Sequence, residues 1–316
     1  MTLRAIAVLA LLAVSDAAVW SHEPATGIWV GRCRIERDDI FLFLRLQPGA
    51  ALVQCPALGV QGSVSVTQND GEHLALSFQT PRGAVRLACT NRGDEMVGTA
   101  ECAESAGACT LRPRREMDAA AWGLVRGNYR LGERIILIGG FEGTGYRFLS
   151  DGDLRTRLTP VGPHEFLSDD LRTIHFELDK QGTAVAALVS REGAPPTRAP
   201  PVQLYTEEPV TFTSGALRLA GRLTLPLGRG PHPAVVFVHG SGPMRPFTME
   251  EADRLAQAGI ASLTFDKRGT GGSTGDWQQA GFDDFADDVL AGVHLLRRDP
   301  RIRADKVGLL GFSQAA

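Results

Sequence analysis

Lysine is scarce in this chain of 316 residues: Lys180, Lys267 and Lys306 are its only lysines. We attribute that scarcity to genome composition. Basic residues number 33 against 36 acidic ones, so the net charge is −3 and no basic excess is available to neutralise phosphates. We therefore expect no nucleic-acid partner. The charged fraction of 22% and the hydrophobic fraction of 43% are ordinary globular values, which argues against wholesale disorder.

The sequence also lacks an apolar run of the roughly 20 residues that a membrane-spanning helix needs. The shorter run Ala5–Val14 follows Arg4 and precedes small residues at Ser15 and Ala17. This pattern is typical of a secretory signal peptide, which we place at residues 1–17. No cysteine follows the cleavage position, so no lipid anchor is indicated. We expect an exported protein, periplasmic or extracellular, without a membrane anchor after signal cleavage.

Cysteine is absent after residue 109, and the five cysteines are Cys33, Cys55, Cys89, Cys102 and Cys109. In an oxidising compartment this clustering predicts one or two disulfides in the first third of the chain. Because five is odd, at least one thiol is left over. The spacings contain neither a Cys-x-x-Cys pair nor a histidine cluster, so we expect no metal site.

Short apolar segments separated by turn residues dominate the first two thirds of the chain. They predict a disulfide-containing β domain at residues 24–115 and a second β region at residues 128–191, both mostly antiparallel. A short helix at 117–126 could connect them. Residues 192–207 are predicted to be a proline-rich linker, because paired prolines hold an extended backbone.

The pattern changes after residue 208. Three continuous apolar segments alternate with two helical patterns, which predicts a parallel sheet covered by helices. The apolar segments are 234–238, 260–265 and 307–310. Apolar residues recur at helical spacing over 282–293 and give that helix one apolar face. We interpret its acidic residues as a solvated face; they are Asp283, Asp284, Asp287 and Asp288.

Two glycine-containing motifs follow the first and third of these segments. Gly311-Phe312-Ser313-Gln314-Ala315 comes after the third, where a glycine two residues before the serine permits a tight strand-to-helix turn. Ala315 stands where the usual Gly-x-Ser-x-Gly pattern has glycine. His239-Gly240-Ser241-Gly242-Pro243 comes after the first, where glycines let the backbone approach a ligand closely.

With Asp266–Ser273 between them, these motifs resemble the α/β-hydrolase superfamily. The closest resemblance is to secreted bacterial hydrolases of the serine aminopeptidase and dienelactone hydrolase branches. It covers about residues 208–316, which would then be an incomplete α/β-hydrolase domain. The fold class expected for the chain is therefore α/β: an N-terminal, mostly antiparallel β region followed by the first half of an α/β-hydrolase parallel sheet.

The resemblance also implies a catalytic site. Ser313 would be the nucleophile, and the backbone N–H groups of Ser241 and Gln314 would form the oxyanion hole. His239 is interpreted as ordering the oxyanion loop by hydrogen bonding, not as the base. The residues expected to support that loop are His239, Gly240 and Gly242.

In this superfamily the acid and the histidine of the triad follow the serine in the chain. The sequence stops three residues after Ser313, so we expect a fragment that is inactive by itself. The parent would be an exported serine hydrolase, with a small-molecule ester as the favoured substrate and no cofactor. Two alternatives stay open. One is a serine peptidase, aminopeptidase-like or prolyl-oligopeptidase-like. The other is a non-catalytic β-domain binding module with a vestigial hydrolase part.

Overall fold

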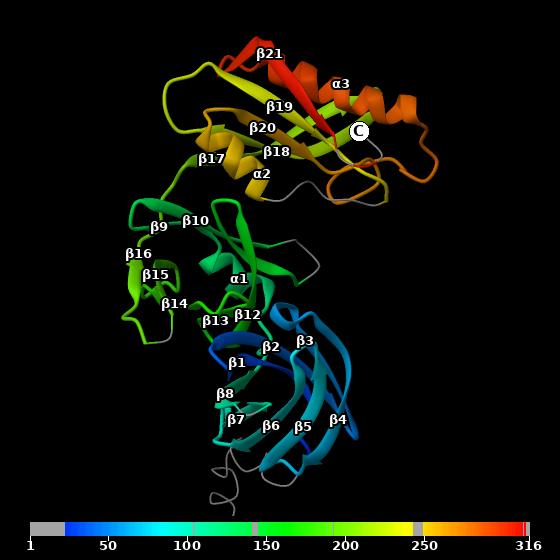
Figure 1. Cartoon of the computed structure of the whole chain (residues 1–316). Helices are drawn as coiled ribbons and strands as arrows, with labels where there is room; N and C mark the ends of the chain where they lie inside the picture. The colour runs from blue at the N-terminus through cyan, green and yellow to red at the C-terminus, as the bar shows by residue number, and fades with distance from the viewer. Residues whose placement is uncertain are drawn as a thin grey trace, which may run out of the picture. The chain divides into compact units, whose positions relative to one another are not determined.

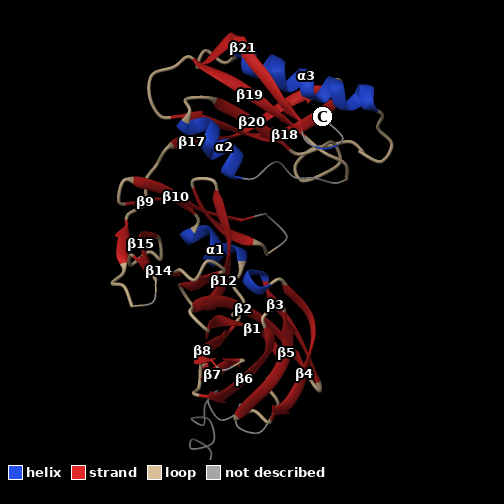
Figure 2. Ribbon diagram, in the orientation of Figure 1, coloured by secondary structure: helices blue, strands red, loops and turns tan. Residues whose placement is uncertain are grey.

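A computed structural model describes residues 23–103, 105–140, 145–191, 193–242, 249–311 and 313 (Figure 1). The predicted signal peptide at 1–17 lies outside these residues. The chain divides into two compact units, and each is built from two segments. The first unit holds the residues up to Val125 together with Thr156–Ala199, and the second holds Arg126–Arg155 together with the residues from Pro200 onward. Strands make up most of the secondary structure in Figure 2.

The first unit begins with a closed barrel of eight antiparallel strands. Each strand pairs with the next along the chain, and the first pairs with the last to close the barrel. At that closure Gly31 is required, because a Cβ there would lie 1.9 Å from the carbonyl oxygen of Thr110. The strands are β1 (Gly27–Ile35), β2 (Asp38–Gln47), β3 (Ala50–Cys55), β4 (Val60–Asn69), β5 (His73–Thr80), β6 (Gly83–Asn91), β7 (Met96–Cys102) and β8 (Ser105–Pro113).

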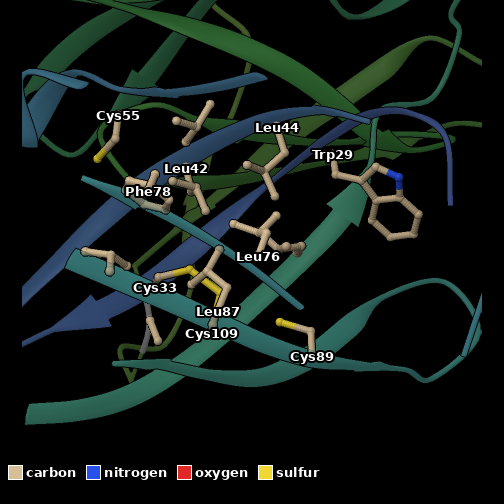
Figure 3. Close-up of a cluster of buried hydrophobic side chains, with 14 of the residues drawn as sticks. Trp29, Cys33, Leu42, Leu44, Cys55, Leu76, Phe78, Leu87, Cys89 and Cys109 are labelled. Atoms are coloured by element: carbon tan, nitrogen blue, oxygen red, sulfur yellow. A yellow bond between two sulfur atoms is a disulfide. The ribbon is translucent and has the colours of Figure 1, made fainter. Parts of the chain in front are cut away.

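Apolar side chains pack together in the barrel (Figure 3). Alternation along the strands turns every second residue inward, as in β6, where Val85, Leu87 and Cys89 are buried. The buried cluster includes Trp29, which is 1% exposed. The interior of an eight-stranded barrel is just wide enough to be filled by such side chains.

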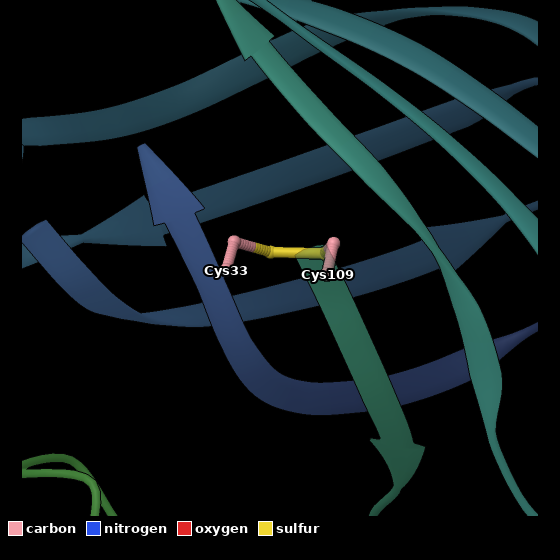
Figure 4. The surroundings of a disulfide bond; sticks show 2 residues. All are labelled: Cys33 and Cys109. Atoms are coloured by element: carbon pink, nitrogen blue, oxygen red, sulfur yellow. A yellow bond between two sulfur atoms is a disulfide. The ribbon is translucent and has the colours of Figure 1, made fainter. Parts of the chain in front are cut away.

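A disulfide joins the first and last strands of the barrel. Cys33 of β1 and Cys109 of β8 are direct partners in the antiparallel pairing, and their sulfurs are bonded (Figure 4). The bond therefore crosses the line where the barrel closes. This confirms the prediction of a disulfide in the first third of the chain. The free cysteines recorded in the described part of the chain, Cys55, Cys89 and Cys102, are buried thiols.

A short helix and five further strands complete the first unit. The strands pair antiparallel in chain order, β12 with β13 and onward to β16. Arg112 of the barrel donates two hydrogen bonds to Glu165, of 2.6 and 2.7 Å, and holds the pKa of that carboxyl below its usual value. The elements are α1 (Ala119–Val125), β12 (Leu154–Gly162), β13 (Glu165–Ser168), β14 (Thr173–Leu178), β15 (Ala184–Ser190) and β16 (Thr197–Ala199). A 3-10 turn, Pro56–Leu58, lies within the barrel sequence. β16 falls inside the segment 192–207 that was expected to be a linker.

The second unit contains three antiparallel strands and a mixed sheet of five strands, called the larger sheet below. Among the three strands, β10 (Arg134–Gly140) pairs with β9 (Gly127–Leu131) and β11 (Arg147–Asp151). The larger sheet has the order β17-β18-β20-β19-β21. Its elements are β17 (Tyr205–Ser214), β18 (Leu217–Pro226), β19 (His232–Val238), α2 (Met249–Gln257), β20 (Ala261–Phe265), α3 (Phe282–Arg298) and β21 (Ile302–Gly311).

Helix α3 buries a narrow stripe against the larger sheet. Val289, Gly292 and Leu296 are its buried apolar positions, and Gly292 faces Leu263 of β20. Phe282 and Leu290 are 71% and 52% exposed, so the apolar face expected over 282–293 is only partly covered.

The predicted α/β fold class is wrong for this chain. Strands make up 57% of it and helices 13%, and the sheets formed by the strands before residue 200 are antiparallel. Parallel pairing is confined to β20, β19 and β21, since β17 and β18 join the same sheet antiparallel. The β-α-β pattern is confined to the last third of the chain. Most strands before it are linked by short turns, which allow only antiparallel neighbours.

Among the described residues, no helix combines the length and the apolar character needed to span a membrane.

Candidate active site

Three parallel strands of the second unit end at one edge of the larger sheet. β19 lies between β20 and β21, and all three run in the same direction. The pairings Val236 with Leu263 and Val238 with Gly311 place their carboxyl ends side by side. In open sheets of this kind ligands bind at the carboxyl ends of the strands. The segments that follow these strands therefore form the candidate site.

Ser313 stands just beyond the end of β21 and is exposed. Its backbone φ is +56°, in the left-handed region that non-glycine residues rarely adopt. Such strain is found where a tight turn has to present a side chain, as in the strand-to-helix turn that carries a nucleophilic serine. The sequence pattern singled out this serine, but its backbone conformation becomes visible only in the structure.

The loop His239–Gly242 follows β19 and is fixed through His239. The Nε2 atom of His239 makes a hydrogen bond with the backbone carbonyl of Phe265, at the end of β20. A carbonyl oxygen only accepts, so Nε2 carries a proton in this contact. Burial lowers the pKa of His239, which favours the neutral ring.

The segment Asp266–Ser273 after β20 is held by its own hydrogen bonds. The Asp266 carboxylate accepts a 2.7 Å bond from the N–H of Gly272, and the Ser273 hydroxyl donates to the Asp266 carbonyl at 2.7 Å. Gly271 has a φ of +54°, and a Cβ there would lie 2.1 Å from the Asp266 carboxylate. The Asp266 carboxylate therefore helps to hold the conformation of this turn.

Arg268 in the same segment binds helix α3. It donates to both oxygens of Asp288, at 2.8 and 3.0 Å, and to Asp284 at 2.8 Å. The Asp288 side chain is 3% exposed and that of Arg268 is 10% exposed. The interpretation of the acidic residues of this helix as a solvated face is therefore wrong for Asp288, and Asp284 carries an ion pair. Their spacing fits a solvated face equally well, and the partner lies 16 to 20 residues away.

Lys267 is a buried residue that the sequence reasoning passed over. Its side chain is 4% exposed, and Nζ donates a 3.1 Å hydrogen bond to the carbonyl oxygen of Gly240. The ammonium also lies 4.3 Å from the centre of the Phe285 ring. Burial lowers the pKa of Lys267. The scarcity of lysine could have drawn attention to it, because it is one of three in the chain.

The ends of the three strands also share a cavity of about 390 Å³. His239, Lys267 and Gly311 contribute to its wall, and most of the remaining lining is apolar. The structure thus brings together the segments that carry His239, Gly240, Ser241, Gly242 and Ser313. Gln314, the other predicted oxyanion donor, lies outside the described residues. The catalytic roles of all six stay predictions.

Comparison with known proteins links the same region to hydrolases. Residues 229–314 match the family model described as serine aminopeptidase, S33. No curated protein matches the chain.

Solved structures give weak likenesses to hydrolases. The α/β hydrolase GrgF from Penicillium sp. sh18 is 25% identical over 34% of this chain and 37% of its own, with a TM-score of 0.31. An esterase from Pyrococcus furiosus is 25% identical over 35% of this chain and 44% of its own, with a TM-score of 0.27. Acylaminoacyl peptidase from Pyrococcus horikoshii is 11% identical over 90% of this chain and 73% of its own, with a TM-score of 0.35. At these TM-scores the likenesses carry no argument about function.

The chain spans less than half the length of GrgF and of the P. furiosus esterase. The family match, in contrast, covers the three motifs from which the resemblance was inferred. The match over residues 229–314 supports the predicted resemblance to the α/β-hydrolase superfamily, on the serine aminopeptidase side.

Proposed function

We propose that this protein is an exported serine hydrolase in which Ser313 attacks the carbonyl carbon of a carboxylic ester. The observation that carries the proposal is the left-handed backbone of Ser313 at the end of β21. The loop His239–Gly242 at the end of the adjacent strand β19 supports it, because a glycine-rich loop beside such a serine can supply oxyanion donors.

The chemistry is acyl transfer in two steps. Ser313 Oγ bonds to the carbonyl carbon, its proton passes to a general base, and the alcohol leaves with a proton after the C–O bond breaks. Water then cleaves the acyl-enzyme and releases the carboxylic acid. The N–H groups of Ser241 and Gln314 would stabilise the oxyanion of each tetrahedral intermediate. His239 is not assigned the role of base, since its Nε2 proton is directed at the Phe265 carbonyl.

Export is part of the same proposal. The N-terminal signal pattern at residues 1–17 suggests it. The disulfide between Cys33 and Cys109 gives support, because such bonds form and persist mainly in oxidising compartments.

A peptide bond is the second candidate for the scissile bond. The family model that matches residues 229–314 is described as a serine aminopeptidase. We favour an ester because its alkoxide leaves more readily than an amine. Hydrolysis of p-nitrophenyl esters compared with aminoacyl p-nitroanilides separates the two.

Covalent labelling tests the role of Ser313. The full-length gene product is treated with a fluorophosphonate, which loses fluoride as the serine oxygen bonds to phosphorus. We expect labelling on the peptide that contains Ser313 and none in the S313A variant. A folded product that stays unlabelled at Ser313 would refute the proposal.

A further inference from the structure

The ammonium of Lys267 is buried, and burying a charged group costs free energy. Its side chain is 4% exposed, and no ion pair joins it to a carboxylate among the residues that the structure describes. Its ammonium is stabilised by the Gly240 carbonyl at 3.1 Å and by the rings of Phe285 and Trp277, whose centres lie 4.3 and 5.7 Å away. A buried cation held mainly by one backbone carbonyl calls for an explanation.

The geometry of the peptide bond supplies one. A trans peptide is planar, and its C=O and N–H point in opposite directions. The carbonyl of Gly240 and the N–H of Ser241 belong to the same peptide unit. Lys267 follows β20, so its bond draws the Gly240 carbonyl toward the β20 side of β19. The Ser241 N–H is thereby turned toward the opposite side of β19.

That opposite side is where Ser313 stands. β19 lies between β20 and β21, and Ser313 comes just beyond the end of β21. We infer that Lys267 is a positioning residue for the oxyanion hole, which acts by locking the Gly240–Ser241 peptide so that the Ser241 N–H faces the acyl group on Ser313. The inference rests on the proposed function, because it assigns a role within the same site.

Neighbouring contacts hold both partners of the hydrogen bond between Lys267 and Gly240 in place. Arg268, the next residue, is held to α3 by Asp288 and Asp284, which fixes the backbone that carries Lys267. His239, the residue before Gly240, is held to the Phe265 carbonyl. The loop is therefore fastened to the end of β20 at two consecutive residues. Of these contacts, the one made by Lys267 sets the orientation of the Gly240–Ser241 peptide.

Lysine replacements in the full-length gene product test the role in catalysis. K267M keeps the length of the side chain and removes the donor, K267R restores a donor, and K306M is the matched control at an exposed lysine of β21. We expect K267M to lower kcat about 10- to 100-fold with KM changed less than about threefold, because misplacing one oxyanion donor weakens transition-state binding. K267R should recover most of the loss. Equal kcat in K267M and K306M would overturn the inference.

Backbone NMR distinguishes a failure of the proposed function from a failure of the inference about Lys267. If wild-type Ser313 does not react with a fluorophosphonate, the proposed function fails, and the position of the Ser241 amide still tests Lys267. We expect the 15N–1H shift and the hydrogen exchange rate of Ser241 to change in K267M and to stay unchanged in K306M. Should K267M fail to fold, K267L gives the same comparison, since it also removes the donor to the Gly240 carbonyl. A Ser241 signal that is identical in wild type, K267L and K306M would then contradict the inference.

Discussion

Ser313 combines an exposed hydroxyl with a backbone conformation that costs free energy. Its φ of +56° places it among the few described non-glycine residues with a positive φ, the others being Glu36, Ala103 and Leu171. A side chain that is held in this way is presented without further movement, which suits a nucleophile.

Substitution of Ser313 should separate strain from chemistry. We expect S313G to be more stable than S313A by about 1 kcal/mol, because glycine adopts a positive φ without the clash of a Cβ. Both variants lack the hydroxyl and should be equally unreactive. Urea unfolding of the two variants measures the difference. Equal unfolding midpoints would show that the turn is not strained.

At this scale the sequence predicted part of the site. Gly311-Phe312-Ser313 and His239–Gly242 are contiguous patterns, so the position of each relative to its strand could be inferred. Lys267 could not be found in that way, because its partner Gly240 lies 27 residues earlier and the contact depends on β20 lying next to β19. Local patterns report turns well, and they carry no information on which loops meet.

The acidic residues of helix α3 lie in two different environments, one buried and one exposed. Asp288 is buried against Arg268, whereas its neighbour Asp287 is exposed. The two carboxylates are adjacent in sequence and differ in orientation by the 100° that separates successive helical residues. A charge pattern alone does not distinguish them.

Paired replacements on α3 test that distinction. D288N should lower the free energy of unfolding by about 3 kcal/mol, because it leaves the buried Arg268 guanidinium without its two-point partner. We take the lower part of the range for a broken buried pair, since Asp284 still accepts a bond from Arg268. D287N, at an exposed position on the same turn, should change it by less than about 0.5 kcal/mol. Denaturant unfolding of both variants gives the answer, and similar losses would contradict the burial of the pair.

For the whole molecule, the individual strands were easier to predict than their arrangement. Alternation and turn residues indicated short strands before residue 200, but closure depends on β1 meeting β8, which begins about 70 residues after β1 ends. The division into units is likewise non-local, since residues 126–155 belong with the segment that starts at Pro200. The α/β class failed for the same reason. It extended the pattern of the last third to a chain that is mostly antiparallel.

The barrel has a core of its own, which leads to a prediction for the whole chain. Every buried residue of its main cluster lies between Ala25 and Leu111, so a fragment of residues 23–116 should fold without the rest. Trp29 is the only tryptophan in that fragment and is 1% exposed, so its fluorescence should be that of a buried indole and should shift to longer wavelength in urea.

The disulfide at the closure makes this fragment sensitive to reductant. Cys33 and Cys109 are separated by 76 residues, and opening a loop of that length should cost about 2–4 kcal/mol, because the unfolded chain regains conformational freedom. The urea midpoint of Trp29 fluorescence should therefore fall on reduction. The C33A/C109A variant is the control, and it should unfold at a lower midpoint that reductant does not change, since the remaining thiols are already free. An exposed Trp29 before any urea is added would instead show that the closed barrel needs the rest of the chain, and an unchanged midpoint on reduction would show that strand pairing alone holds the closure.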